Sequence, residues 1–349
     1  MTHVSAGLLL SQLLPGPSRA WSAVAGLALT LLPDIDYFLV YWDRLAFIRH
    51  HRGFTHSLLA VPLFALLVAA LGRGLGGPRW FRPLFVMGLA ILGAHLLLDL
   101  ATSYGTQLLN PLSRRRFSLD WLFIIDPYFT VFLLAGAAAA LASPGWGRRL
   151  GAGCLAAAGI YLVLCSLYHH QALKLARRVF PAQSSHGWTV AALPQPFSCR
   201  RWQLITAGPG EIRQVFVELP YGAWLGRGVP VRRVEAAAVG LEQDCQEPPA
   251  PSGSYQSPPD LVIQTWQAAA EPPDYPFEAR EVLDRYLEFA RFPLLLRVRC
   301  QRGGQILEWL DLRFSVPGRA MPFVLQLHLD AQGRLQQWLI GRGGGPGHR

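Results

Sequence analysis

The sequence predicts two parts, an N-terminal all-α, multi-pass membrane helical bundle over residues 1–178 and a small, soluble α+β domain with a mostly antiparallel sheet over 179–349. Hydrophobic residues make up 51% of the 349 positions and charged residues only 15%, whereas soluble domains carry about 25% charged residues. Residues 1–178 contain no Glu and hold 15 of the 32 Lys and Arg residues. After Arg178, Pro and Gly separate short alternating segments, which is typical of strands.

The charge and cysteine content exclude several protein classes. The net charge is +10, but the chain lacks the dense basic runs interleaved with aromatic residues that nucleic-acid surfaces need, so we expect no nucleic-acid partner. The five cysteines form no CxxC pair. This scattered set argues against a disulfide scaffold and against a thiolate zinc site, and it favours a reducing compartment.

The first residues do not resemble a secretory signal. The apolar stretch Leu8–Leu14 has no Lys or Arg before it, whereas signal peptides begin with positive charge. We therefore expect residues 1–20, and His3 with them, to remain in the mature protein.

Four to six segments of the first half are predicted to enter the membrane. A spanning helix needs about 20 mostly apolar residues, and a large soluble helical domain is less favoured because these segments are apolar all round and rich in Gly and Ala. Three segments are long enough, namely 81–103, 121–142 and 149–168. The segment Ser57–Leu71 is shorter, and the segments 4–14 and 20–33 could be half-spanning.

The basic residues of the loops predict the orientation. One set of loops contains residue 3, residues 34–55, residues 102–120 and the chain after 169. This set carries nine Lys or Arg residues, and the loops on the opposite side carry six. The excess predicts a multi-pass protein of the bacterial inner membrane with the first set of loops, and the soluble domain, in the cytoplasm.

The second half is predicted to contain strands and one helix. The helix is expected at 277–291, a linker at 246–259 and a flexible tail at 341–349. Strands are expected at Ile212–Leu219, Leu261–Trp266, Leu294–Cys300, Ile306–Phe314, Phe323–Leu329 and Leu335–Ile340.

Ionisable side chains interrupt the apolar half, where they are energetically expensive and usually face a bundle interior. Helix length and the alternating direction of short hairpins bring these side chains toward one membrane face. The candidate metal ligands are His3, Asp34, Asp36, His51, His56, His95 and Asp99.

The spacing of these residues suits a shared site. His95 and Asp99 are four residues apart, which places both on one face of a helix. Asp34 and Asp36 could both bind a metal, or one could bind while the other holds a histidine. Each residue alone is more simply explained as a core histidine or a helix cap. Several carboxylates and imidazoles beside lipid, however, require a compensating charge, which a divalent cation supplies. Nitrogen and oxygen ligands favour Zn²⁺, with Mn²⁺, Fe or Mg²⁺ as alternatives.

Four motifs carry a family resemblance: TH at the start, LPDIDY, HRGFTHS and HLLLDLATSYGTQLLNP. Together they resemble the YdjM-like family of inner-membrane proteins, described as metal-dependent hydrolases, over about residues 1–178. The resemblance implies a membrane-embedded hydrolase, and the H-x3-D element is also similar to one in zinc phospholipases C. The matching positions are His3, Asp34, Asp36, His51, Arg52, His56, His95 and Asp99.

The expected activity is hydrolysis by metal-activated water of a lipid or lipid-linked phosphoester at the membrane interface. Arg52, Asp34 and Asp36 are the expected catalytic residues, with Arg52 neutralising a substrate oxygen or, alternatively, extending to the interface. Membrane lipids are the expected partners, and Arg114–Arg116 either attract anionic headgroups or serve only to orient the chain. Substrate contacts from Tyr104, Thr106 and Asn110, and a cavity or capping role for Asp126, are weaker expectations.

Two other functions fit parts of the sequence. A membrane regulator or sensor would keep a structural metal site and bind a protein partner, not yet identifiable, through residues 179–349. A transporter would place polar groups near the membrane midplane in several helices. It ranks last because the polar groups gather toward one end and no inverted repeat is evident.

Overall fold

The computed structural model describes residues 1–180, 187–225, 232–235, 254–267, 275–301 and 303–343. The chain forms two compact units, Met1–Ser166 and Leu167–Arg349. The division falls inside α7 (Trp146–Val179), a helix of 34 residues, whereas the composition changes at 178/179.

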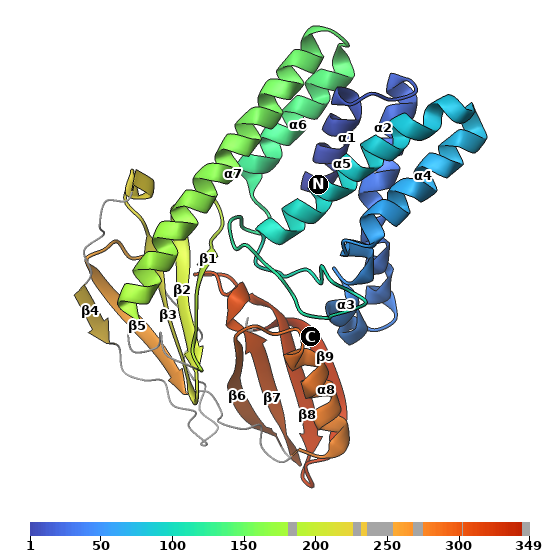
Figure 1. The fold of residues 1–349 in the computed structure, drawn as a ribbon. Helices are drawn as coiled ribbons and strands as arrows, with labels where there is room; N and C mark the ends of the chain where they lie inside the picture. Colours follow the sequence, from blue (N-terminus) through green and yellow to red (C-terminus); the bar gives the residue numbers. More distant parts are fainter. Residues whose placement is uncertain (181–186, 226–231, 236–253, 268–274, 302, 344–349) are drawn as a thin grey trace. The chain divides into compact units, whose positions relative to one another are not determined.

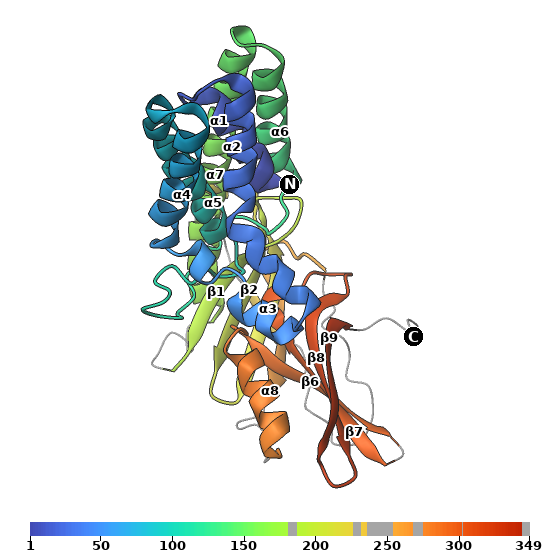
Figure 2. The same ribbon diagram turned by 90° about the vertical axis from the view of Figure 1, so that its right-hand side faces the viewer.

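The first unit consists of helices alone among its regular elements. Figures 1 and 2 show α4 and α5 side by side, with α1 and α2 packed next to α5. In chain order the elements are α1 (Thr2–Leu13), α2 (Arg19–Leu31), η1 (Pro33–Tyr41), α3 (Arg44–His50), η2 (Phe54–His56), α4 (Ala60–Gly76), η3 (Pro78–Trp80), α5 (Phe81–Ala101) and α6 (Pro127–Ala142).

Small residues allow these helices to pack closely. A Cβ placed on Gly88 of α5 would lie 2.8 Å from the Cβ of Ala65 in α4. A Cβ on Gly136 of α6 would lie 2.8 Å from the Cβ of Cys154 in α7. Close backbone approach through small residues is how helices associate in membranes, so the Gly- and Ala-rich composition has a direct packing role.

Two helical segments are long and apolar enough to cross a membrane, Pro78–Ala101 and Trp146–Val179. Two bent pairs, α2 with η1 and the α3–η2 segment with α4, would raise the number to four, and α6 is a shorter apolar helix. The predicted span 121–142 is wrong at its start. Asp126 accepts a hydrogen bond from the Phe129 N–H and Pro127 occupies the first helical position, so the helix begins there.

Arginines and tryptophans gather at the end of the bundle where α1 ends and α2 begins. The Arg19 guanidinium donates to the carbonyl oxygens of Ala140 and Leu141 at the end of α6. The Trp21 and Trp80 rings lie 5.5 Å apart. Cations at helix C-termini and interfacial tryptophans are typical of a membrane boundary, so we call this group the anchor end.

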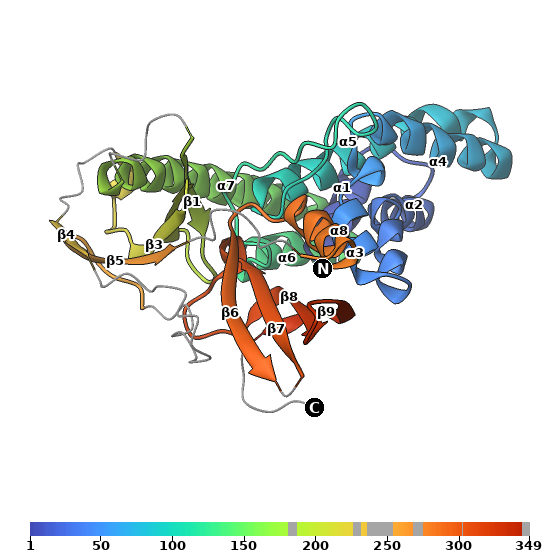
Figure 3. The same ribbon diagram turned by 90° about the horizontal axis from the view of Figure 1, so that it is seen from below.

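The second unit contains two sheets and a helix (Figure 3). The first sheet has the order β1-β2-β3-β5-β4 and the second β6-β7-β8-β9, and among these strands only β4 and β5 pair in parallel. The elements are β1 (Thr189–Pro194), β2 (Arg201–Gly208), β3 (Glu211–Glu218), β4 (Arg232–Glu235), β5 (Asp260–Gln267), α8 (Phe277–Leu287), β6 (Pro293–Gln301), β7 (Gly304–Asp311), β8 (Met321–Asp330) and β9 (Leu335–Gly343).

A shared apolar core joins the two sheets. Leu193 and Ile205 of the first sheet belong to one cluster with Leu294 and Leu310 of the second. All six predicted strands coincide with observed ones, except that the segment 306–314 leaves the sheet at Asp311. The strands β1, β2 and β4 were not predicted. β2 is buried on both faces over residues 202–206 and therefore lacks the alternation that marks a half-exposed strand.

The cysteines differ from the expectation at one position. Cys154, Cys165 and Cys199 are free thiols, whereas Cys300 is disulfide-bonded. This disulfide bond contradicts the expectation of a reducing compartment for the part of the chain that contains Cys300. Cys245, residues 246–253 of the predicted linker and 344–349 of the predicted tail lie outside the described residues.

Candidate metal centre

The candidate site lies where two apolar segments break. The α2–η1 pair bends by 52° and the α3–η2 segment meets α4 at 67°. Asp34 and Asp36 follow the first break, because Pro33 ends the α-helical pattern of α2 and begins η1. His56 precedes the second break. Interrupted membrane helices commonly hold ions or substrates at the interruption. The two breaks place the side chains of Asp34, Asp36 and His56 within the apolar helical bundle.

Four side-chain atoms from three segments converge: Asp34 Oδ1, His56 Nε2, His95 Nε2 and Asp99 Oδ2. The His56 Nε2 atom lies 3.3 Å from His95 Nε2, 3.4 Å from Asp34 Oδ1 and 3.3 Å from Asp99 Oδ2. The His95 Nε2 atom lies 3.8 Å from Asp34 Oδ1 and 3.5 Å from Asp99 Oδ2. With bonds of about 2.0–2.1 Å, tetrahedral ligands lie about 3.3–3.4 Å apart. We call these four residues the convergent set.

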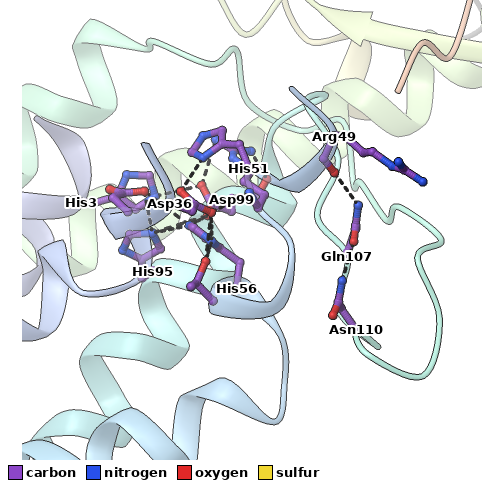
Figure 4. Close-up of polar contacts among 12 residues, drawn as sticks. His3, Asp36, Arg49, His51, His56, His95, Asp99, Gln107 and Asn110 are labelled. Carbon is purple, nitrogen blue, oxygen red and sulfur yellow. Dashed lines mark hydrogen bonds and ion pairs between the residues drawn. The ribbon is translucent and has the colours of Figure 1, made fainter. Parts of the chain in front are cut away.

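His3 approaches the convergent set from the first turn of α1. Its Nε2 atom lies 3.2 Å from Asp99 Oδ1, and its ring centroid lies 4.1 Å from that of His95. Two combinations have ligand atoms close enough for one cation, His3 with His95 and Asp99, and Asp34 with His56 and His95. Figure 4 shows His3, His95, His56 and Asp99 pointing toward one another.

The charge of the cluster is unbalanced. The cluster holds three carboxylates, those of Asp34, Asp36 and Asp99, and one guanidinium, that of Arg52, which pairs with Asp99. With neutral histidines this leaves two negative charges, which a divalent cation would balance. The buried atoms Asp99 Oδ2 and His3 Nε2 lie 3.2–3.5 Å from their ion-pair partners but make no hydrogen bond of regular geometry among the described residues. Buried polar atoms are otherwise almost always satisfied, so both observations fit a cation at this position.

Asp36 lies behind His56 and orients it together with Thr55, whose hydroxyl lies 3.0 Å from His56 Nδ1 and donates to Asp36. Its Oδ2 atom is 3.5 Å from His56 Nδ1 and accepts hydrogen bonds from the Thr55 hydroxyl and the Arg52 N–H. Its Oδ1 atom is 2.8 Å from His51 Nδ1. A carboxylate on the far nitrogen of a ligating histidine fixes the tautomer and the ring orientation. The structure thus places Asp36 and His51 beside the convergent set and not in it, which matches the second of the two roles expected for the aspartate pair.

Arg52 is buried against Asp99. Its Nη2 atom is 2.9 Å from Asp99 Oδ1, and its Nη1 atom donates to the Thr102 hydroxyl and the Asp99 carbonyl. The guanidinium lies 4.9 Å from the centre of the Tyr104 ring. Extension of this side chain to the interface is therefore wrong. The Arg52 backbone has φ 58°, an unfavourable region for a non-glycine residue that usually marks a functional or tightly constrained position.

The segment after α5 supports the site from outside. The Arg116 guanidinium donates to the carbonyls of Ile48 and His51 and so holds the turn that carries His51. Tyr104 and Thr106 are buried, and the Asn110 side chain donates to Gln107. These three residues are packed into the fold, as is Asp126, which caps α6 and accepts a hydrogen bond from Tyr161.

Sequence reasoning missed two supporting residues, Thr55 and Thr102. Thr55 lies within the HRGFTHS motif, next to His56, and was considered only as a helix cap. Thr102 follows α5 directly. Both hold site residues through side-chain hydrogen bonds, and only the position of Thr55 inside a motif gave any signal.

Comparison with known proteins identifies the family of the region that carries the cluster. The YdjM inner membrane protein family matches residues 1–173, the part of the chain that contains every residue of the cluster. The N-terminal half of the chain belongs to the YdjM family. It is an inner membrane protein family, and the transmembrane character of the apolar helices follows from it.

Curated relatives resemble the same region. The inner membrane protein YdjM of Escherichia coli (strain K12) is 43% identical over 113 residues, which cover 29% of this chain and 55% of that protein. The protein YfhP of Bacillus subtilis (strain 168) is 30% identical over 145 residues, covering 39% of this chain and 44% of YfhP. The chain spans about half the length of these relatives. No solved structure matches the chain.

Proposed function

We propose that this YdjM-family protein is a membrane-bound, metal-dependent hydrolase. The observation that carries the proposal is that two imidazole nitrogens lie 3.3 Å apart and that each lies 3.3–3.8 Å from the same two carboxylate oxygens, among apolar helices. Such separations match the edges of a metal coordination sphere.

The donor chemistry favours zinc. Two nitrogen and two oxygen ligands without thiolate suit Zn²⁺, while Mn²⁺, Fe and Mg²⁺ remain alternatives. When bound there, such a cation would lower the pKa of a water molecule and polarise a phosphoester bond. Hydrolysis would then add water across the P–O bond, and the leaving alcohol would take up a proton.

The chain's own residues have distinct tasks in this proposal. Asp34, His56, His95 and Asp99 bind the cation, with His3 adjacent to Asp99. Asp36 keeps His56 in the tautomer that presents Nε2 to the centre. Arg52 neutralises one oxygen of Asp99 and thereby fixes which oxygen faces the cation. Asp36 and Arg52 were expected to be catalytic residues. In this proposal both are positioning residues.

A lipid or lipid-linked phosphoester is the proposed substrate. The centre lies among apolar helices of an inner membrane protein, so a substrate that is itself part of the bilayer can reach it. The loop charges predict a cytoplasmic soluble unit, whereas the disulfide bond of Cys300 is typical of an oxidising compartment; the proposal does not depend on the side of the membrane on which this unit lies.

One observation favours the alternative function, a regulator with a structural metal. Asp99 Oδ2, 3.3 Å from His56 Nε2, would close the sphere if it joined Asp34, His56 and His95; structural zinc sites are closed in this way, whereas catalytic sites keep one position open. In the hydrolase proposal Asp34, the most exposed of the four, leaves room for water or substrate.

The deciding experiment compares hydrolysis by the wild-type protein and the variants His95→Ala and Asp99→Ala on a panel of phosphoester lipids in vesicles. The proposal expects both variants to lose hydrolysis. Matched controls are His170→Ala and Asp284→Ala, which change the same residue types at exposed positions of the second unit. Full hydrolysis by both site variants would refute the catalytic role. Loss of a bound partner without any hydrolysis in the wild type would support the regulator.

A further inference from the structure

The members of the cluster differ in exposure. The side chains of His56, His95 and Asp99 are at most 2% exposed, whereas Asp34 is 39% and His3 24% exposed. Both exposed residues contact His95, Asp34 through Oδ1 and His3 through its ring. Among the described residues of the first unit, η1 and the first turn of α1 therefore form the exposed side of the centre, where a substrate would approach.

Helix lengths place this side within the hydrocarbon layer. The helix α2 has 13 residues and α1 has 12, which correspond to lengths of about 20 and 18 Å. The hydrocarbon layer is about 30 Å thick. With the anchor end at one boundary, Asp34 and His3 lie about 10 Å short of the other boundary. The continuation of α2 into η1 supplies the missing length, since the pair together has the length and hydropathy of a membrane span.

The segment η1 presents apolar side chains on its outer surface. Ile35, next to Asp34, is 54% exposed and Phe38 is 60% exposed. Tyr41 and Trp42, at the end of η1, are also exposed. Aromatic residues with a polar edge prefer the headgroup level, so η1 descends from that level at Trp42 to the candidate centre at Asp34.

We propose that η1 and the first turn of α1 form a lateral entrance, through which a bilayer phospholipid places its acyl chains against Ile35 and Phe38 and its phosphate at Asp34 and His3. The occupant is a lipid of the surrounding leaflet because the exposed side chains lie at hydrocarbon depth on a segment that belongs to a membrane span.

Charge makes this entrance selective. Two of the three carboxylates have no guanidinium partner, so an anionic phosphate is repelled unless a cation is present at the convergent set. The acyl chains need no cation, because they only displace the acyl chains of other lipids along η1. The inference names the substrate class and its path, and it rests on the proposed function only for the chemical step that follows.

The first test locates η1 without requiring any activity. The full-length protein is reconstituted in vesicles that contain phosphatidylglycerol with a diazirine in the middle of one acyl chain, and the labelled peptides are mapped after irradiation. We expect label in residues 33–42 at a level comparable with that in the exposed apolar face of α6, in the wild type and in His95→Ala. Label in α6 without label in 33–42 would show that η1 lies in water and would overturn the entrance.

The second test compares chain lengths. Phe38→Ser is expected to lower kcat/KM for a dioleoyl phosphoester lipid about tenfold, the order of one lost apolar side-chain contact, and to leave the dihexanoyl lipid unchanged. The matched control is Leu71→Ser in α4, which is also 60% exposed, and it should change neither.

The other possible results of these two tests also support or contradict the lateral entrance. Equal losses on both lipids, or faster turnover of the dihexanoyl lipid by the wild type, would indicate access from water and contradict the entrance. If the wild type hydrolyses neither lipid but residues 33–42 are labelled, the entrance stands as a lipid-binding feature and the proposed hydrolysis fails.

Discussion

The two units of the chain bury charge in opposite ways. In the second unit the buried charges form complete pairs. The Arg313 Nη2 atom lies 2.9 Å from Asp311 Oδ2, and Asp311 also accepts hydrogen bonds from the N–H groups of Arg291 and Phe292. The Arg297 Nε atom lies 2.8 Å from Glu308 Oε2. Every one of these carboxylates has a cation of its own.

In the candidate metal centre of the first unit, three carboxylates lie near one buried guanidinium. The Arg52 guanidinium pairs with Asp99, whereas Asp34 and Asp36 face imidazole nitrogens of His56. A complete pair leaves no buried charge uncompensated, whereas an excess of carboxylates facing one point needs a positive ligand to compensate it. The difference separates a structural use of buried charge from a binding site within one chain.

The largest expected effect is on activity. Asp99→Asn removes the negative charge that faces the centre but keeps the size of the side chain. We expect a loss of hydrolysis of about a thousandfold or more, because the cation is no longer held in a productive position. Initial rates on a phosphoester lipid in vesicles measure it. Near wild-type rates with Asp99→Asn would mean that the excess of carboxylates does not serve a cation.

Asp311→Ala tests the buried ion pairs of the second unit. Removing one partner of a buried pair leaves an unpaired charge and costs about 3–5 kcal/mol. We expect a large drop in the thermal midpoint followed by tryptophan fluorescence, with metal content unchanged per folded protein. A variant that loses metal but keeps its thermal midpoint would reverse the roles assigned to the two units.

Asp36→Ala sharpens the comparison within the cluster. Loss of an outer carboxylate behind a ligating histidine lowers metal affinity about 10–100-fold, and zinc competition with a fluorescent chelator measures it. The control is Asp43→Ala, which removes the cap of α3. Unaltered affinity with Asp36→Ala would show that Asp36 does not orient His56.

The smallest expected effect concerns helix caps. Asp43→Ala and Asp126→Ala each remove a side-chain acceptor at a helix N-terminus and should cost about 1 kcal/mol of stability. Thermal unfolding measures the change. A loss of metal with either variant would contradict the assignment of these aspartates to capping.

Local sequence patterns could predict part of this structure. The apolar segments predict the membrane helices, and the spacing of His95 and Asp99 places both on one face of α5, as observed. The alternating segments predict six strands correctly. These features depend on neighbours within a few positions, where helix and strand periodicity determine direction.

Other features depend on contacts between distant residues and could not be predicted. Arg52 meets Asp99 across 47 positions, and no local pattern distinguishes this buried pair from an interfacial arginine. Asp36 lies behind His56 because η1 winds as a 3-10 helix after Pro33. The separation of Asp34 from Asp36 into two roles therefore required the three-dimensional arrangement.

The most direct test of the central claim is the metal content of the purified full-length protein, measured by elemental analysis before and after chelation. The account predicts one divalent cation per chain, lost in His95→Ala, and a lower thermal midpoint of the wild type after chelation. A wild-type protein without stoichiometric metal, whose thermal midpoint is the same with and without chelator, would contradict it.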